Sequence, residues 1–543
     1  MFSHTKGALI YDYLVRFTAI FSILFTPFYN FYGDRSQPIS WLSLSYSALY
    51  FAIVSVVLVM LIRRSQGILA TAVFTATVAL FLDFQYDWFR GVPLFAITLL
   101  IFGIFWALRK HVALILSVVF NTMLISSILI ISLGLGSGTP DQVVSTPGGQ
   151  SAPQDPEDRP VIVHLVLDEH AGIAGIPLDV PGGPELRQSL QKFYQSNGFR
   201  LFENAISEYV SSKNSIPDIL NLSAGTEPEQ WYYGKKPYVL RTSKYFELLN
   251  KSGYELIVHQ STYMDFCKEF PAIVSRCHTY RYDGTDWLRN SHLTDREMFY
   301  GLFGMYINRS NIFEAISKLY VRLTKTARLL YIRLPPLAEW DGSAASLSAL
   351  AAFDDFIEDV SEGPPGAVYF AHILLPHSPY VFDSDCRLRP EIFGWMGNVP
   401  LHSKFNTEDS REQRYSRYLE QMKCTRSKLE LLFSRMRAAG RFANATIVIH
   451  GDHGSRIYLT EPKSRNAESL DVRDYLDSFS TLFAAKAPGL APGYDKTWAP
   501  VSQLLGQLAG AGGLPSDTEL LPRVYLEGSD DEDWVELPWP EAE

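Results

Sequence analysis

The chain has 543 residues, more than one ordinary domain holds, and a formal net charge of −10. An acidic chain lacks the basic field of a nucleic-acid binder, so its composition argues against nucleic acid as a partner. The mean hydropathy of +0.01 averages two unlike parts, because almost all the long apolar runs lie before about residue 136.

Five apolar runs open the chain, and most reach the roughly 20 residues that a membrane-spanning helix needs. They cover residues 9–29, 41–62, 68–86, 93–108 and 112–135, of which the fourth is marginal in length. A cleaved signal peptide would supply one short run instead of five. Basic residues precede the first run and follow the second and fourth, so the positive-inside bias predicts a cytoplasmic N-terminus and an extracytoplasmic chain from residue 136 onward.

Residues 136–158 are rich in Gly, Ser, Pro and Gln, which predicts a linker between a transmembrane domain at 1–135 and a catalytic domain at 159–510. Residues 511–543 are expected to form a C-terminal strand followed by a disordered acidic tail.

All four cysteines lie in the expected extracytoplasmic domain, where an even number suits disulfides. The short loop between Cys267 and Cys277 favours their pairing, which leaves Cys386 with Cys424. Their spacing does not fit a zinc ribbon.

Two β-branched apolar runs, 161–167 and 445–450, predict parallel strands buried on both faces. The first ends at Asp168, and the second is followed by Asp452 and His453 between two glycines. Ligands gather at the carboxyl ends of such strands, and a carboxylate beside an imidazole can hold a divalent metal. An ordinary turn after a strand is the alternative for each motif taken alone.

A third apolar run leads into a polar loop that carries His372 and His377, five positions apart. A lone histidine is more often structural, but two near a strand end favour a functional role. Earlier in the chain, between the first two of these histidine- and acid-bearing regions, Ser211, Ser212 and Ser215 lead into an expected helix. A hydroxyl there can cap the helix, or it can act as a nucleophile that the helix dipole and a metal activate.

The order of these motifs resembles the alkaline phosphatase superfamily, most of all its membrane-bound sulfatase-like branch with lipid A phosphoethanolamine transferases and lipoteichoic acid synthases. The likeness covers most of residues 157–490. It implies an α-helical membrane domain of about five spans, followed by an α/β sandwich with a mostly parallel central sheet. It also implies that Asp168, Ser212, Asp452 and His453 hold one divalent metal, zinc by likeness, with manganese or calcium as alternatives.

In that family the nucleophile lies five positions before a proline, which selects Ser212 against Pro217, with Ser211 and Ser215 as alternatives. His372 and His377 match the two strand-end histidines, which implies that they act on the phosphoryl oxygens or the leaving alkoxide, or hold a second metal. The chain departs from the family in its serine nucleophile and in having no histidine after His453. These departures leave open whether a second metal is bound.

The resemblance predicts an enzyme of a bacterial-type inner membrane with its catalytic domain in the periplasm. It would transfer a phosphoryl-linked headgroup from a phospholipid donor to a lipid- or glycan-linked acceptor through a covalent serine intermediate. A phosphate or sulfate ester hydrolase and a catalytically silent lipid sensor are the alternatives. Residues 311–333 predict a basic amphipathic helix, either packed on the core or lying on an anionic membrane surface.

Overall fold

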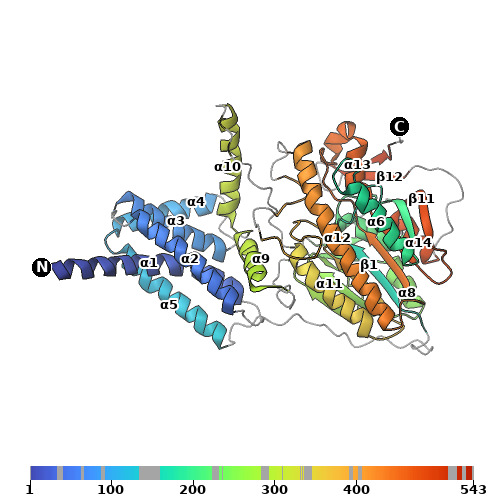
Figure 1. The fold of residues 1–543 in the computed structure, drawn as a ribbon, viewed down its shortest axis with the longest axis horizontal. Helices are drawn as coiled ribbons and strands as arrows, with labels where there is room; N and C mark the ends of the chain where they lie inside the picture. The colour runs from blue at the N-terminus through green and yellow to red at the C-terminus, as the bar shows by residue number, and fades with distance from the viewer. Residues whose placement is uncertain are drawn as a thin grey trace. The chain divides into compact units, whose positions relative to one another are not determined.

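The computed structural model divides the chain into two compact units, traced in Figure 1. The first contains Met1–Pro140, Ser291–Leu337 and Pro390–Ile392, and the second contains the rest. The structure describes residues 2–33, 41–62, 67–86, 92–133, 159–222, 231–234, 237–282, 293–308, 310–329, 332, 334, 345–390, 395–400, 406–510, 522–528 and 534–540.

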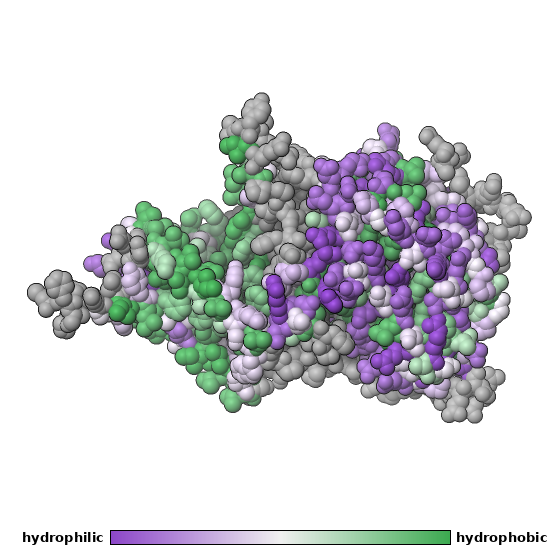
Figure 2. Space-filling view, in the orientation of Figure 1, coloured by the Kyte–Doolittle hydropathy of each residue, from purple (hydrophilic) through white to green (hydrophobic). Residues whose placement is uncertain are grey.

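The five apolar runs form helices, as the sequence predicts. They are α1 (Phe2–Gly33), α2 (Trp41–Ile62), α3 (Ile68–Gln85), α4 (Val92–Ala107) and α5 (Val112–Ser132). Among the described residues, four helices are long and apolar enough to cross a membrane, and α4 is shorter at 16 residues. Hydrophobic residues cover much of their visible surface in Figure 2, as expected for a surface that faces lipid.

Two helices from the middle of the chain, α9 (Asp295–Asn308) and α10 (Asn311–Leu329), belong to this first unit. The ring of Tyr306 stacks on Phe84 of α3 at a centroid distance of 4.0 Å. Phe303 meets Tyr50 of α2 edge to face at 4.7 Å. The sequence predicts that the membrane domain ends at residue 135. In the structure, residues 291–337 also belong to the unit that contains the membrane helices.

The start of α10 is fixed by Asp83, a fully buried acid near the end of α3. Its carboxylate accepts hydrogen bonds from Ser310 Oγ at 2.5 Å, from the backbone N–H of Ile312 at 3.0 Å and from Asn311 Nδ2 at 3.0 Å. An acid at a helix N-terminus satisfies N–H groups that have no partner within the helix. The predicted basic amphipathic helix thus exists, and it begins on a membrane helix.

The second unit is built on an eight-stranded sheet in the order β11-β2-β10-β9-β1-β8-β5-β7. Every neighbouring pair runs parallel except those of β10, so the mostly parallel sheet of the predicted α/β fold is confirmed. The strands are β1 (Ile162–Leu167), β2 (Arg200–Ile206), β5 (Leu256–Ser261), β7 (Val274–Tyr280), β8 (Val368–Ile373), β9 (Thr446–Gly451), β10 (Phe483–Lys486) and β11 (Gly493–Pro500). A smaller sheet joins β3 (Tyr232–Tyr233), β4 (Tyr238–Leu240) and β6 (Met264–Asp265).

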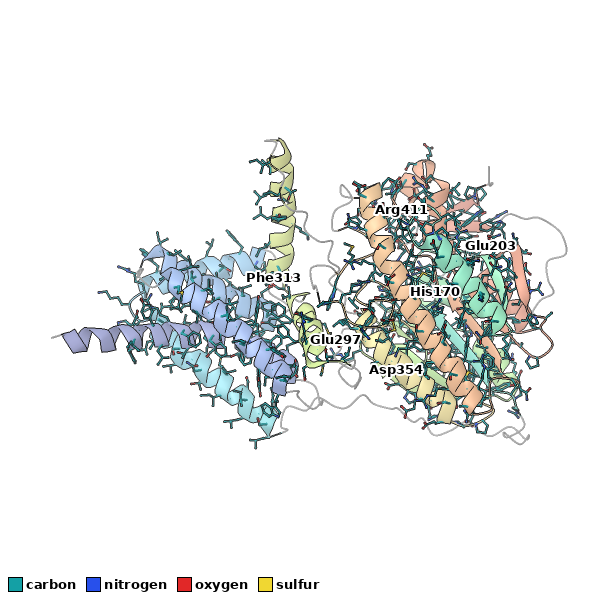
Figure 3. The ribbon with its side chains drawn as sticks, viewed as in Figure 1. His170, Glu203, Glu297, Phe313, Asp354 and Arg411 are labelled. Carbon is teal, nitrogen blue, oxygen red and sulfur yellow. A yellow bond between two sulfur atoms is a disulfide. The ribbon has the colours of Figure 1, made fainter. Side chains whose placement is uncertain are left out.

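Helices cover both faces of the large sheet (Figure 1). A continuous apolar core lies between one face and α7 (Ser212–Asn221), α8 (Lys244–Lys251) and α14 (Val501–Leu508). The other face carries α6 (Gly183–Ser196), α11 (Ala345–Glu362) and α12 (Glu408–Ala438). Arg411 of α12, labelled in Figure 3, donates from Nε to Oδ2 of buried Asp477 at 2.9 Å and ties α12 to α13 (Val472–Phe479).

Both expected disulfides are present, Cys267 with Cys277 and Cys386 with Cys424. The expectation of a disordered tail is wrong for residues 534–540. There β13 (Trp534–Pro538) pairs with β12 (Arg523–Glu527), and Trp539 is buried against Trp498 at a centroid distance of 4.8 Å. Buried aromatic area supplies the stabilisation that an acidic composition alone did not indicate.

Candidate metal centre

Two neighbouring strands deliver acids to the same end of the sheet. β1 and β9 pair in parallel, with Leu167 opposite Gly451, so Asp168 and Asp452 follow at the same level. Both strands are apolar and buried almost throughout, as central parallel strands are, and both carboxylates are buried at their ends. This register brings the two acids to the same edge of the sheet, where the sequence predicts that ligands gather.

Ser212 and His453 complete the group. Ser212 Oγ lies 3.3 Å from Asp168 Oδ2 and 3.4 Å from His453 Nε2. His453 Nε2 lies 3.2 Å from Asp452 Oδ2. The structure therefore brings together all four residues that the sequence proposes as metal ligands.

The local fold of α7 separates the three candidate serines. Ser211 is the N-cap, with extended backbone, and its Oγ accepts from Asn214 Nδ2 at 2.9 Å. Ser212 is the first residue of the helix, which puts Pro217 beyond the first turn. Ser215 Oγ is buried without a hydrogen-bond partner. Of the three, Ser212 is the serine whose hydroxyl meets the acids.

The donor set fits a divalent cation. Asp168 Oδ1 and Asp452 Oδ2 are buried and accept no hydrogen bond of standard geometry. Burial and the charge of Asp168 raise the pKa of Asp452 to about 6. Two buried carboxylates repel each other, and a cation between them removes both the repulsion and the unsatisfied oxygens. Carboxylate, imidazole and hydroxyl donors suit zinc or a harder divalent ion.

The two loop histidines take different positions. His372 is fully buried, and its Nε2 lies 3.2 Å from Asp168 Oδ2, next to the candidate ligands. His377 Nε2 lies 3.3 Å from Glu169 Oε1 and 3.3 Å from Arg456 Nη2. Burial lowers the pKa of His377, but the charges of Glu169 and Asp168 outweigh burial and leave this pKa above its ordinary value.

Glu169 is a site residue to which the sequence reasoning gave no role. It is fully buried and has a φ of 61°, a left-handed conformation that is unusual outside glycine. Its carboxylate accepts from Arg456 Nε at 3.0 Å, Asn398 Nδ2 at 2.9 Å and the backbone N–H of Ser378 at 3.1 Å. The signal available in the sequence was its place directly after the strand-end acid.

Glu169 also shares a second cluster with Asp168 and His377, in which one donor atom of each lies within 4.8 Å of the others. The resemblance left open whether a second metal is bound. Arg456 already occupies Glu169 Oε1, so this cluster holds fewer unsatisfied atoms than the first.

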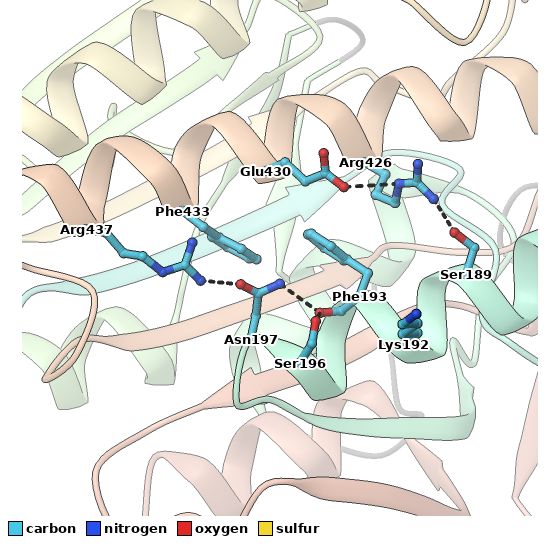
Figure 4. A pocket seen from close by; sticks show the side chains of 9 residues that line it. All are labelled: Ser189, Lys192, Phe193, Ser196, Asn197, Arg426, Glu430, Phe433 and Arg437. Atoms are coloured by element: carbon cyan, nitrogen blue, oxygen red, sulfur yellow. Dashed lines mark hydrogen bonds and ion pairs between the residues drawn. The ribbon is translucent and has the colours of Figure 1, made fainter.

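A pocket of about 380 Å³ lies elsewhere, between α6 and α12 (Figure 4). Its two arginines are engaged with neighbours: Arg426 with Ser189 and Glu430, and Arg437 with Asn197. None of the strand-end ligands lines it. We therefore place the chemistry at the ends of β1 and β9.

Several solved structures are similar to this chain. The C-terminal periplasmic domain of EcEptC from Escherichia coli, in complex with Zn, is 13% identical over 72% of this chain and 96% of its own, with a TM-score of 0.40. A phosphonate monoester hydrolase of Agrobacterium radiobacter is 11% identical over 69% and 81%, with a TM-score of 0.39. An alkaline phosphatase superfamily protein from Vibrio parahaemolyticus is 12% identical over 74% and 80%, with a TM-score of 0.36.

No protein-family model and no curated protein matches the chain. Similarity to solved structures at this identity and TM-score establishes neither activity nor substrate. The chemistry is therefore inferred from the chain's own residues.

Proposed function

We propose that the chain is a metal-dependent enzyme that transfers a phosphoryl-linked headgroup from a membrane phospholipid to a cell-envelope lipid or glycan. One observation carries the proposal. The hydroxyl of Ser212 lies at the first residue of α7, within 3.4 Å of both Asp168 and His453. A hydroxyl buried among metal-ligand side chains at a helix N-terminus is arranged for nucleophilic attack on an anionic ester.

Asp168, Asp452, His453 and Ser212 would hold the ion. When bound, a divalent cation lowers the pKa of a coordinated hydroxyl and neutralises charge on a phosphoryl oxygen. Ser212 Oγ, its proton lost to solvent, attacks phosphorus and forms the Oγ–P bond as the bond to the donor alkoxide breaks. The acceptor hydroxyl then loses its proton to solvent and attacks the same phosphorus, and the Oγ–P bond breaks as the Ser212 alkoxide leaves.

His377 is suited to supply the proton that the departing donor alkoxide needs. Its raised pKa favours the protonated imidazole, and Glu169 stabilises that form at 3.3 Å. His372 has a different setting, because its Nε2 contacts Asp168 and its ring is fully buried. We infer that His372 orients the Asp168 carboxylate instead of contacting substrate.

The membrane helices support a lipid substrate, since a donor that stays in the bilayer makes an apolar anchor useful to the enzyme. We propose an inner-membrane location with the α/β unit in the periplasm. Two disulfides in that unit agree with an oxidising compartment.

The test uses the purified full-length chain in vesicles of phospholipid whose headgroup phosphate is radioactive. We expect label on the protein, mapped to Ser212 by mass spectrometry, and headgroup transfer to an added envelope acceptor. Label on Ser212 that passes to water alone would favour the hydrolase. Absence of label in a metal-loaded chain would favour the silent sensor and overturn the proposal.

A further inference from the structure

A second group of metal-ligand side chains lies away from the candidate metal centre. His259 of β5 and His278 of β7 are direct partners in the parallel ladder. Asp359 of α11 faces both: its Oδ2 lies 3.0 Å from His259 Nε2 and 3.6 Å from His278 Nε2. One donor atom of each residue lies within 4.8 Å of the other two.

This group occupies the α11 face of the sheet. Side chains alternate along a strand, and Val258, the neighbour of His259, belongs to the apolar core on the opposite face. Phe356 of α11 packs edge to face on His259, with a centroid distance of 5.3 Å. None of the three side chains is a candidate ligand of the strand-end centre, and β5 is separated from β1 by β8.

The donor atoms of the three side chains are close enough for one cation to contact all of them. The rings of His259 and His278 stack at 4.4 Å with planes 14° apart, and both Nε2 atoms approach one carboxylate oxygen. His278 Nε2 is buried without a hydrogen-bond partner. A buried nitrogen in that state is destabilising, and a bound cation would satisfy it. His259 Nε2 is hydrogen-bonded to Asp359 Oδ2 at 3.0 Å, and the 3.0 and 3.6 Å spacings lie on either side of the 3.2–3.4 Å spacings among Ser212, Asp452 and His453.

Arg276 is the feature that most opposes a cation here. Its Nη2 lies 3.3 Å from Asp359 Oδ1, so the group could be an ion-pair network alone. Arg276 meets the other carboxylate oxygen, however, and leaves Oδ2 to the two imidazoles. His278 Nε2 lies 3.6 Å from Oδ2 and makes no hydrogen bond to it. Two imidazoles and one carboxylate form a donor set that zinc prefers.

We propose that His259, His278 and Asp359 form a second site for a zinc-class divalent ion, with its remaining position open to water. Such an ion would join β5, the edge strand β7 and helix α11 through three side chains. Its role would be to hold the edge of the sheet against α11, on the strand that also carries disulfide-bonded Cys277.

Elemental analysis of the purified full-length chain after dialysis against dilute zinc tests this site. We expect two zinc ions per wild-type chain, one in His278→Ala, one in Asp452→Ala and none in the double variant. Arg276→Gln is the matched control, because it changes a neighbour of Asp359 that cannot ligate, and it should keep two ions. Equal zinc in wild type and His278→Ala would overturn the second site. Equal zinc in wild type and Asp452→Ala would count instead against the strand-end centre.

A thermal measurement covers the case in which His278→Ala does not fold. In the Asp452→Ala chain, added zinc should raise the melting temperature, since a ligand that binds only the folded state stabilises it. Asp359→Asn in the same background keeps the side-chain volume and should lose that rise. If zinc does not change the melting temperature and Arg276→Gln lowers it, the three residues form an ion-pair network without a metal.

Discussion

Ser212 differs from its neighbour Ser215 in what its hydroxyl touches. Ser212→Ala should abolish headgroup transfer and leave folding intact, because it removes the nucleophile and one weak ligand. Ser215→Ala is the matched control: its Oγ has no hydrogen-bond partner, so its loss should change the unfolding free energy by less than about 1 kcal/mol. Labelled-headgroup transfer and melting temperature measure the two effects. If Ser212→Ala stayed active and Ser215→Ala were folded but inactive, the nucleophile would be Ser215 instead.

Individual residues were predictable where chemistry follows a local pattern. Asp452 and His453 come directly after a buried strand, and the sequence alone indicates where such a strand ends. The role of Glu169 depends on partners 209 and 287 positions away, Ser378 and Arg456. No spacing in the sequence encodes such a long-range contact, which explains why adjacency to Asp168 was noticed and the network was not.

At the scale of elements, β1 and β9 are joined by a pair of buried histidines. His164 Nε2 and His450 Nε2 lie 2.8 Å apart, so one ring donates a hydrogen bond to the other. Burial holds the pKa of His164 well below its ordinary value and that of His450 at about 4. In the unfolded chain both histidines take up a proton near pH 6.5, whereas in the folded chain they stay neutral to lower pH. The folded state is therefore most stable, with respect to these two groups, above pH 6.5, and it loses that stability as the pH falls toward about 4.

His164→Gln should therefore flatten the acid side of the stability curve. Each histidine with a lowered pKa contributes up to about 1.4 kcal/mol per pH unit across that window, and the variant removes one such group. Melting temperatures of the full-length chain between pH 7 and pH 4.5 provide the measurement. Parallel curves for wild type and variant would show that this pair does not set the acid sensitivity.

The attachment of α10 to α3 predicts a second effect at this scale. Asp83→Ala should lower the melting temperature and open the start of α10 to protease. The variant leaves buried N–H and O–H donors unsatisfied, at about 1–3 kcal/mol each. Asp12→Ala on α1 is the control, since Asp12 is half-exposed and pairs with Arg16 of its own helix. Equal protease sensitivity in the two variants would contradict a specific role for Asp83.

For the whole molecule, the main prediction concerns which side of the membrane each part faces. A reporter active only in the periplasm should work when fused after Gly138 and fail when fused after Arg64. The expectation follows from the basic residues after the second and fourth apolar runs. The opposite pattern would mean that one helix, with α4 as the first suspect, does not span.

The two-part architecture was predictable because apolar runs and buried strands leave different periodicities in the sequence. Which residues belong to each part was not predictable from the sequence. Residues 291–337 follow the strands of the second unit in the sequence, yet Tyr306 and Phe303 pack among aromatic rings of α2 and α3. Amphipathic periodicity predicted a helix at 311–333, of which α10 forms Asn311–Leu329, but periodicity does not say which surface a helix will cover.

This interleaving has a consequence for biosynthesis. Helices α1–α5 leave the ribosome first, whereas the helices that complete their packing are made after β1 and β7 of the other unit. Until then the aromatic side chains of Tyr50 and Phe84 lack their later partners Phe303 and Tyr306. Insertion into the bilayer can therefore precede completion of the membrane unit by more than 150 residues of synthesis. The nascent chain has to keep the aromatic surface of α2 and α3 free of other contacts while the first strands of the α/β unit leave the ribosome.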